Sequence, residues 1–406
     1  MPENFNDSYS KDKIRAVDAK YEAQKIAFAP LAFQAARALL ELGILKAISD
    51  SGEKGLSFGE TAEAAGISVY GAKVLLEIAL GMNLVKVPLS PGSGQPSGKP
   101  GSEDDRFVLG KIGWFLLEDE MTRVNFNFVN DVCYKGAYEL TRSVKTGKPA
   151  GLEIFGVGEE LSPCGPAEGA GSEGTGSKNP GWATIYEALS SLPAQVKESW
   201  FAFDHFYSDI GFEEALPIVF SSNPKKIIDI GGNTAKWAVR CCRYDPQVEV
   251  IIVDLPGQTA MAEKEIALAG FSGRIKTLSC NVLDKETVFP PGADIIWMSQ
   301  FLDCFSPEKA ACIMAKVRAA SDPDTDVYIL EPIWDKQRFA AASFSLQATS
   351  LYFTCMANGD SKMYRYGELA GIIESSGFEI ADAWHDLGSN NYSLLRCRLH
   401  SEAGKK

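Results

Sequence analysis

From Pro224 to the C-terminus, short runs of apolar residues alternate with segments whose apolar positions recur at helical spacing. The expected strands cover residues 226–230, 249–253, 274–279, 293–298, 326–331 and 391–397. Regular alternation of strand and helix is typical of a parallel sheet covered by helices on both faces. The pattern therefore predicts an α/β fold of the doubly wound, mainly parallel, Rossmann-like class, in which ligands bind beyond the carboxyl ends of the strands.

The first hundred or so residues show a different pattern, in which helices are followed by a hairpin. An apolar, alanine-rich run predicts a helix over 28–42, and Ser57 and Ser68 stand where they would cap the next two helices. The runs 84–87 and 106–109 predict a strand pair, joined by a tip between Pro88 and Asp105 that is rich in Pro, Gly and Ser. Two helices and a hairpin in this order form a winged helix.

A winged helix serves either to bind DNA or to pack against another subunit. A DNA-reading helix over 69–80 would need several side chains that contact bases, and it offers little besides Lys73. The apolar surfaces of residues 28–42 and 115–138 suit subunit burial instead. We therefore expect a homodimer, with a winged-helix DNA-binding regulator as the alternative.

Three regions follow from these patterns. Residues 1–150 form the expected winged-helix and helical dimerisation domain, and residues 224–406 form the expected Rossmann-like domain. Between them, residues 151–223 contain a Gly-, Ser- and Glu-rich insert at 162–180 and then an aromatic-rich helical segment from Trp182 to Phe220. Some of these aromatic side chains are expected to line the cleft of a planar substrate.

Composition narrows the functional classes. The chain has 406 residues, 45% hydrophobic and 23% charged, as in a globular protein of two domains. A net charge of −13 without a basic patch argues against nucleic acid as a partner. We expect no membrane span and no signal peptide, and hence a cytoplasmic protein. Nine scattered cysteines without a C-x-x-C pair, and only three histidines, predict free thiols and no metal site.

The most specific motif is a glycine turn between two expected strands. Asp229-Ile230-Gly231-Gly232 ends the first strand, and Asp254-Leu255-Pro256 ends the second. The acid at the tip of the second strand can accept hydrogen bonds from ribose hydroxyls. The turn lacks the further glycines of G-x-G-x-x-G, so no pyrophosphate cradle is expected. Both features favour S-adenosyl-L-methionine over a dinucleotide.

With these positions identified, the chain resembles the plant-type small-molecule O-methyltransferases and their bacterial relatives over most of its length. The resemblance rests on Ala38–Ile44, Asp229–Gly232, Asp254–Pro256, Cys280–Leu283 and Phe301–Glu308. It implies a winged-helix dimerisation domain followed by an S-adenosylmethionine-binding domain. It also implies that the cofactor contacts Asp229, Gly231, Gly232, Asp254, Leu255, Asn281, Val282 and Ser299.

The chain departs from the family at the catalytic positions. The family's general-base histidine falls on Asp303, its adenine-side lysine on Ser299, and the acid of its G-D-M-F segment on Asn281. Glu331 matches one of the two acids that flank the histidine, whereas the other is lost near Lys362. The resemblance therefore makes Asp303 and Glu331 the candidate catalytic residues.

Three hypotheses follow. The leading one is a dimeric methyltransferase that O-methylates a hydroxyl or carboxylate of a small aromatic or polyketide-like acceptor. Methyl transfer needs an in-line approach and removal of the acceptor's proton where it has one, so an acceptor that arrives ionised would need no histidine. The second is a relative that binds the cofactor without methylating, for example a hydroxylase, and the third is the DNA-binding regulator.

Overall fold

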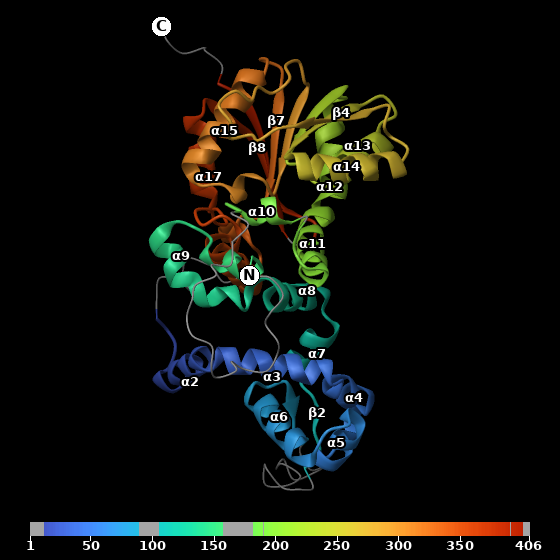
Figure 1. Cartoon of the computed structure of the whole chain (residues 1–406), viewed down its shortest axis with the longest axis vertical. Coiled ribbons are helices and arrows are strands. Elements are labelled where there is room, and N and C mark those ends of the chain that lie inside the picture. Colours follow the sequence, from blue (N-terminus) through green and yellow to red (C-terminus); the bar gives the residue numbers. More distant parts are fainter. Residues whose placement is uncertain (1–11, 89–104, 157–181, 190, 390, 401–406) are drawn as a thin grey trace, which may run out of the picture. The chain divides into compact units, whose positions relative to one another are not determined.

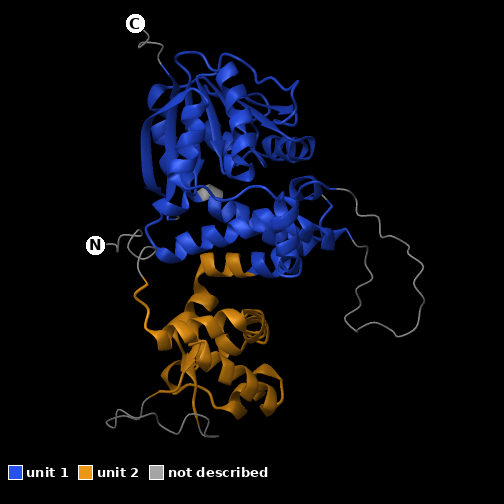
Figure 2. Cartoon of the chain, turned by 90° about the vertical axis from the view of Figure 1, so that its left-hand side faces the viewer, with its two compact units in different colours: residues 1–5, 127–406 blue, residues 6–126 orange. Residues whose placement is uncertain are grey.

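The computed structural model describes residues 12–88, 105–156, 182–189, 191–389 and 391–400. Two compact units make up the chain, residues 6–126 and residues 1–5 with 127–406 (Figure 2). The interior of the hairpin tip expected between Pro88 and Asp105, and the whole insert at 162–180, lie outside the described residues.

The unit formed by residues 6–126 has the expected helices and hairpin (Figure 1). Its elements are α2 (Ala16–Ala27), α3 (Ala29–Glu41), α4 (Ile44–Asp50), α5 (Phe58–Ala65), α6 (Val69–Gly81), β1 (Val85–Lys86), β2 (Val108–Leu109) and α7 (Lys111–Glu118). Ser57 and Ser68 cap α5 and α6 as expected, since each hydroxyl accepts a hydrogen bond from a backbone N–H of the first helical turn. The two short strands pair antiparallel.

The boundary between the units differs from the one expected at residue 150. It falls within α8 (Glu120–Phe128), and the residues that follow belong to the second unit. Phe128 and Val132 are buried there in one apolar cluster with Trp200 and Met356. Packing against residues far along the chain therefore places 127–150 with the C-terminal part.

Helices from three stretches of the second unit cover one end of its sheet (Figure 1). They are the π-helix η2 (Val129–Cys133), α9 (Leu140–Thr146), α10 (Ile185–Ala188), α11 (Ala194–Ser208), α16 (Ala340–Tyr352) and the π-helix η9 (Phe353–Ala357). The others, α12 (Phe212–Val219), α13 (Lys236–Tyr244), α14 (Pro256–Leu268), α15 (Pro307–Ala320) and α17 (Tyr366–Ser375), pack along the sheet.

The sheet of the second unit has seven strands in the order β5-β4-β3-β6-β7-β9-β8. The strands are β3 (Lys226–Ile230), β4 (Glu249–Asp254), β5 (Ile275–Ser279), β6 (Ile295–Ser299), β7 (Asp326–Glu331), β8 (Phe378–Leu387) and β9 (Tyr392–Leu399). From β5 to β7 every pairing is parallel, whereas β9 runs antiparallel to both of its neighbours. The predicted Rossmann-like sheet is thus confirmed, with β8 as an edge strand that the sequence analysis missed.

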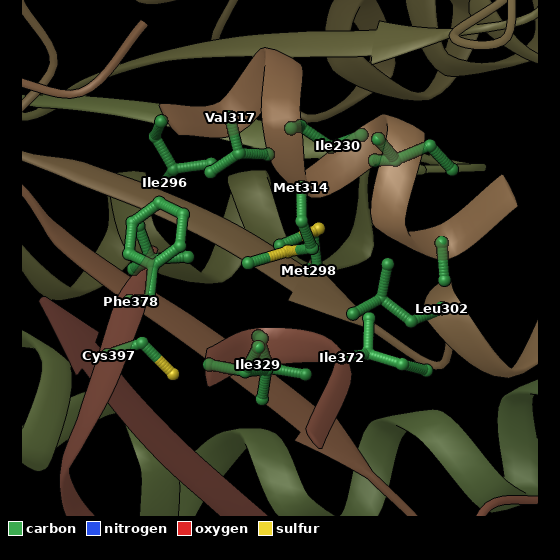
Figure 3. Packing of buried hydrophobic residues seen from close by; sticks show 14 of the residues in the cluster. Ile230, Ile296, Met298, Leu302, Met314, Val317, Ile329, Ile372, Phe378 and Cys397 are labelled. Atoms are coloured by element: carbon green, nitrogen blue, oxygen red, sulfur yellow. The ribbon is translucent and has the colours of Figure 1, made fainter. Parts of the chain in front are cut away.

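Apolar side chains fill the space between this sheet and α15 and α17 (Figure 3). Ile230, Met298 and Ile329 from three neighbouring strands are buried there with Met314 and Ile372 from the two helices. This packing fixes the carboxyl ends of β3, β6 and β7 side by side, where the candidate site lies. Among the described residues no single helix is long and apolar enough to cross a membrane; α5 and α6 reach that length and hydropathy only jointly, across a bend of 110°.

Candidate active site

The glycine turn after β3 leaves no room for side chains. Gly231 has φ +78°, and a Cβ there would lie 2.2 Å from Cδ2 of Phe301. A Cβ on Gly232 would lie 2.7 Å from Oδ2 of Asp229. Because glycine is the residue that fits here, backbone rather than side chain borders the space beyond β3, as close approach of a ligand requires.

Asp254, at the end of β4, faces this turn. Its Oδ2 accepts a hydrogen bond from the Asn233 backbone N–H at 2.9 Å, and its Oδ1 accepts one from the Leu255 N–H at 2.7 Å. Burial raises the pKa of this carboxyl to about 6, and the two backbone donors oppose the rise. Each oxygen keeps a second lone pair, so the fixed carboxylate can still accept from two hydroxyls of a ribose.

Asp229 lies beneath the turn and is 2% exposed. Burial raises its pKa to about 8, and the negative charge of Asp254 contributes to the shift. Its Oδ2 has no hydrogen-bond partner among the described residues. With this raised pKa, Asp229 is mainly protonated at pH 7 and able to donate a hydrogen bond.

Asn281 and Ser299 lie at the ends of β5 and β6. The Asn281 side-chain oxygen accepts the Leu283 N–H at 3.0 Å, which leaves its amide N–H groups as the available donors. The Ser299 hydroxyl is buried and has no partner within the described part of the chain. All eight residues expected to contact the cofactor line one cavity of about 260 Å³, namely Asp229, Gly231, Gly232, Asp254, Leu255, Asn281, Val282 and Ser299.

The loop after β6 carries Asp303 into the same cavity. Asp303 lies in the short helix η7 (Leu302–Cys304), and three contacts hold this loop in place. The Glu331 Oε1 accepts the N–H groups of Phe301 and Leu302 at 3.1 and 2.9 Å. On the other side, the Asn358 amide donates to the Cys304 carbonyl at 2.6 Å. The position of Asp303 is therefore set by distant parts of the chain.

Asp303 and Glu331 form a buried acid pair. Each is 2% exposed, and the two carboxyl groups lie close enough to influence each other's charge. Burial raises the pKa of Asp303 to about 6, and burial together with the charge of Asp303 raises the pKa of Glu331 well above its usual value. Asp303 Oδ1 and Glu331 Oε2 accept from no N–H or O–H donor of the described residues. One proton, held mainly by Glu331, satisfies both oxygens and leaves Asp303 ionised.

Several lining residues were not identified from the sequence. They include Thr184, Glu187, Asp204, His205, Asn233, Lys236, Tyr352, Phe353 and Met363. The sequence contains a partial indication of this set, since Asp204 is four residues from Trp200 on α11 and so shares its helix face. The expected aromatic wall is present, since Tyr186, Trp200 and Phe203 from the segment between Trp182 and Phe220 line the cavity. At the position of the lost second acid, Lys362 bonds Glu368 at 2.7 Å, and its neighbour Met363 lines the cavity instead.

Known proteins share this architecture. An L-tyrosine C(3)-methyltransferase of Streptomyces lavendulae is 22% identical over 87% of this chain and 85% of its own. The crystal structure of the S-adenosylmethionine-dependent methyltransferase SibL superposes with a TM-score of 0.63 at 20% identity, over 92% of this chain and 98% of that one. The O-methyltransferase NcsB1, solved with S-adenosylmethionine and 2-hydroxy-5-methyl naphthoic acid, gives 0.59 at 18% identity, over 90% and 95%.

Two families of domains match the two parts of the chain. Residues 20–89 match the Dimerisation2-like domain, and residues 206–379 match the O-methyltransferase domain. The second range contains the glycine turn, Asp254 and the acid pair. The chain therefore belongs to the S-adenosylmethionine-dependent O-methyltransferases.

Proposed function

We propose that this enzyme transfers the methyl group of S-adenosylmethionine to a hydroxyl of a small aromatic acceptor, with Asp303 as the base. The observation that carries the proposal is that one cavity joins the residues of the glycine turn to Asp303 and an aromatic wall. Two relatives support an aromatic hydroxyl compound as the acceptor, because one is named for L-tyrosine and another is bound to a hydroxynaphthoic acid.

The residues present fit the cofactor. The turn at Gly231 and Gly232 has no room for a Cβ, so backbone borders the cavity there, and Asp254 offers fixed acceptors for a ribose. The unpartnered Oδ2 of Asp229 marks a buried polar group that a ligand can satisfy. When bound, S-adenosylmethionine supplies a methyl group on a sulfonium, which is already a good leaving group. The protein's tasks are then to align the acceptor and to accept its proton.

In this proposal Asp303 accepts the proton of the acceptor. Its ionised carboxylate accepts the proton of the acceptor hydroxyl while the hydroxyl oxygen forms its bond to the methyl carbon. The protonated Glu331 donates to Asp303 and so holds its carboxylate in one orientation. Tyr186 lines the same cavity, and its hydroxyl, next to Cys304, has no hydrogen-bond partner assigned among the described residues. We assign to it a hydrogen bond to the acceptor oxygen.

A second candidate reaction is transfer to a ring carbon beside the hydroxyl. It is favoured by one observation, the C(3)-methyltransferase relative. The same base would serve both reactions, because loss of the phenolic proton makes both the oxygen and the neighbouring ring carbon nucleophilic. Alkaline titration of the product distinguishes them, since O-methylation removes the ionisable phenol and C-methylation keeps it.

The assembly proposed for this enzyme is a homodimer formed by the Dimerisation2-like domain. Large apolar side chains are exposed on α2, α3 and α7 of this unit and at the junction of α2 and α3, among them Val17, Ile26, Phe28, Leu31, Trp114 and Phe115. Lys73, the one basic residue of the helix expected to read DNA, instead lies over the Phe58 ring at 5.8 Å. The eight described cysteines are all free thiols, which fits the reducing cytoplasm as the proposed location.

The proposal is tested by incubating the purified protein with methyl-labelled S-adenosylmethionine and a panel of phenols. Calorimetry with S-adenosylhomocysteine measures cofactor binding independently of the acceptor. Label transfer to a phenol that Asp303→Asn abolishes would support the assignment. Failure of the folded protein to bind S-adenosylhomocysteine at millimolar concentration would refute it.

A further inference from the structure

The acceptor side of the cavity combines aromatic faces with carboxylates. Tyr186, Trp200 and Tyr352 contribute the aromatic faces. Glu187, Asp204 and Asp303 contribute the carboxylates. Aromatic faces and carboxylates both attract cations, the first through the ring quadrupole and the second through its charge. The aromatic faces and the carboxylates therefore both favour a cationic ligand.

Basic side chains are scarce along this wall. Among the described residues that line the cavity, only Lys236 and His205 are basic. Lys236 begins α13 immediately after the glycine turn, on the side of the cofactor residues. His205 is adjacent to Asp204, with its Nδ1 at 3.8 Å from the Asp204 Oδ2. The described acceptor side thus presents no lysine or arginine that would pair with an acceptor carboxylate.

Asp204 is the carboxylate placed between the cofactor turn and the aromatic wall. Its Oδ2 accepts a hydrogen bond from the Asn233 side-chain amide at 3.1 Å, which ties it to the glycine turn. Its side chain is 27% exposed, so it borders the cavity rather than being sealed beneath it. Asp204 and Asp303 both line this one cavity.

The net positive charge of the cofactor is too small to neutralise the carboxylates on the acceptor side. S-adenosylmethionine carries a sulfonium, an ammonium and a carboxylate, and so one net positive charge. Asp254 is the carboxylate that faces the cofactor's ribose, and Glu187, Asp204 and Asp303 remain on the acceptor side. An anionic acceptor would be repelled by them, whereas a cationic acceptor would be attracted.

We propose that the acceptor is a phenol that carries a protonated amine, and that Asp204 binds this ammonium group. The proposal rests on the methyl-transfer function given above and names its substrate class. With its hydroxyl at Asp303, such a molecule places its ring against the aromatic wall and its ammonium beside Asp204. A hydrogen bond between an ammonium and a carboxylate is among the stronger polar contacts, so it would discriminate against neutral and anionic phenols.

The test uses three phenols that share one ring and differ in charge: tyramine, 4-ethylphenol and 3-(4-hydroxyphenyl)propionate. Their dissociation constants are measured by calorimetry at pH 7 with the full-length protein saturated with S-adenosylhomocysteine. We expect tyramine to bind at least about tenfold more tightly than the propionate, with 4-ethylphenol between them. Equal or tighter binding of the propionate, or binding of none of the three at millimolar concentration, overturns the proposal.

Two variants assign the preference to Asp204. Asp204→Asn keeps an oxygen that accepts from Asn233 but removes the charge, and we expect the tyramine preference to fall about tenfold. Glu198→Gln removes one charge from the exposed side of the same helix and is expected to leave the preference unchanged. An unchanged preference in Asp204→Asn refutes the assignment. A loss of S-adenosylhomocysteine affinity alone in that variant would make Asp204 a cofactor residue and also refute it, while leaving the methyl-transfer function intact.

Discussion

Replacing Asp303 by asparagine tests the central claim about catalysis. The amide has nearly the shape of the carboxylate but cannot accept the acceptor's proton. We expect turnover to fall by about 10²-fold or more, the usual contribution of a positioned base. Because Asp303 is not among the residues at the ends of β3 and β4, affinity for S-adenosylhomocysteine should stay unchanged.

The pKa values of the phenol and of Asp303 show how well Asp303 can accept the phenolic proton. A phenol with a pKa of about 10 is a poor proton donor to an ordinary aspartate, and the gap costs roughly 8 kcal/mol for full transfer. Burial raises the pKa of Asp303 from 3.8 to about 6. That rise removes about 3 kcal/mol of the gap. The remainder is compatible with catalysis because the proton moves while the new bond to the methyl carbon forms, so a free phenolate is never required.

The pH dependence gives a second measurement of the same group. A base must be ionised to act, so turnover should rise with pH through the pKa of Asp303 at about 6 and then level off. At pH 5 about one tenth of the plateau rate is expected. Asp303→Asn should lose this limb. In Glu331→Gln the side chain still donates to Asp303 and, like the protonated Glu331, carries no charge, so the limb should stay near pH 6.

A matched control is Asp360→Asn, an acid that pairs with Lys309 at 2.7 Å and does not line the cavity. It should leave both turnover and the pH profile unchanged. If Asp303→Asn keeps turnover within a factor of two of the wild type on the true acceptor, the reasoning is refuted. Asp303 would then be structural, and the acceptor would arrive already ionised.

The remaining predictions concern the cofactor site, metal, stability and assembly. Asp254→Ala should weaken S-adenosylhomocysteine binding about tenfold or more in calorimetry, since charge-assisted hydrogen bonds contribute about 1.5–3 kcal/mol each; unchanged affinity would contradict the assignment. A chelator should leave turnover unchanged, and a loss restored by one added metal would show a metal role. Because the folded-state pKa of Asp229 is raised from 3.8 to about 8, the stability that its protonated form contributes is present below pH 4 and lost as pH rises through 8. Asp229→Asn should therefore gain melting temperature relative to the wild type at pH 8 but not at pH 4. Light scattering at micromolar concentration should give a dimer, whose interface we expect to bury about 2,000 Å² or more.

The sequence predicted the sheet well because its central strands are buried on both faces. Such strands are continuous apolar runs, as in β3 and β6, and their ends mark where polar residues must face a ligand. Between its buried ends the edge strand β8 has only half-buried and exposed positions, and it carries charged residues, so the sequence contains no apolar run that predicts it. Residues 127–150 were assigned to the wrong unit because their partners, such as Trp200 and Met356, are distant in the chain.

The candidate site shows the same division between local and tertiary information. The residues proposed to bind the cofactor follow strands or end them, so the local pattern was enough to predict residues that line one cavity. Whether Asp303 can act as a base depends instead on burial and on Glu331, a neighbour from the next strand that keeps the shared proton. The same holds for Asp204, whose position beside the aromatic wall follows from the packing of α11 against the glycine turn. The groups proposed to select the acceptor and to accept its proton are therefore the ones that only tertiary structure brings together.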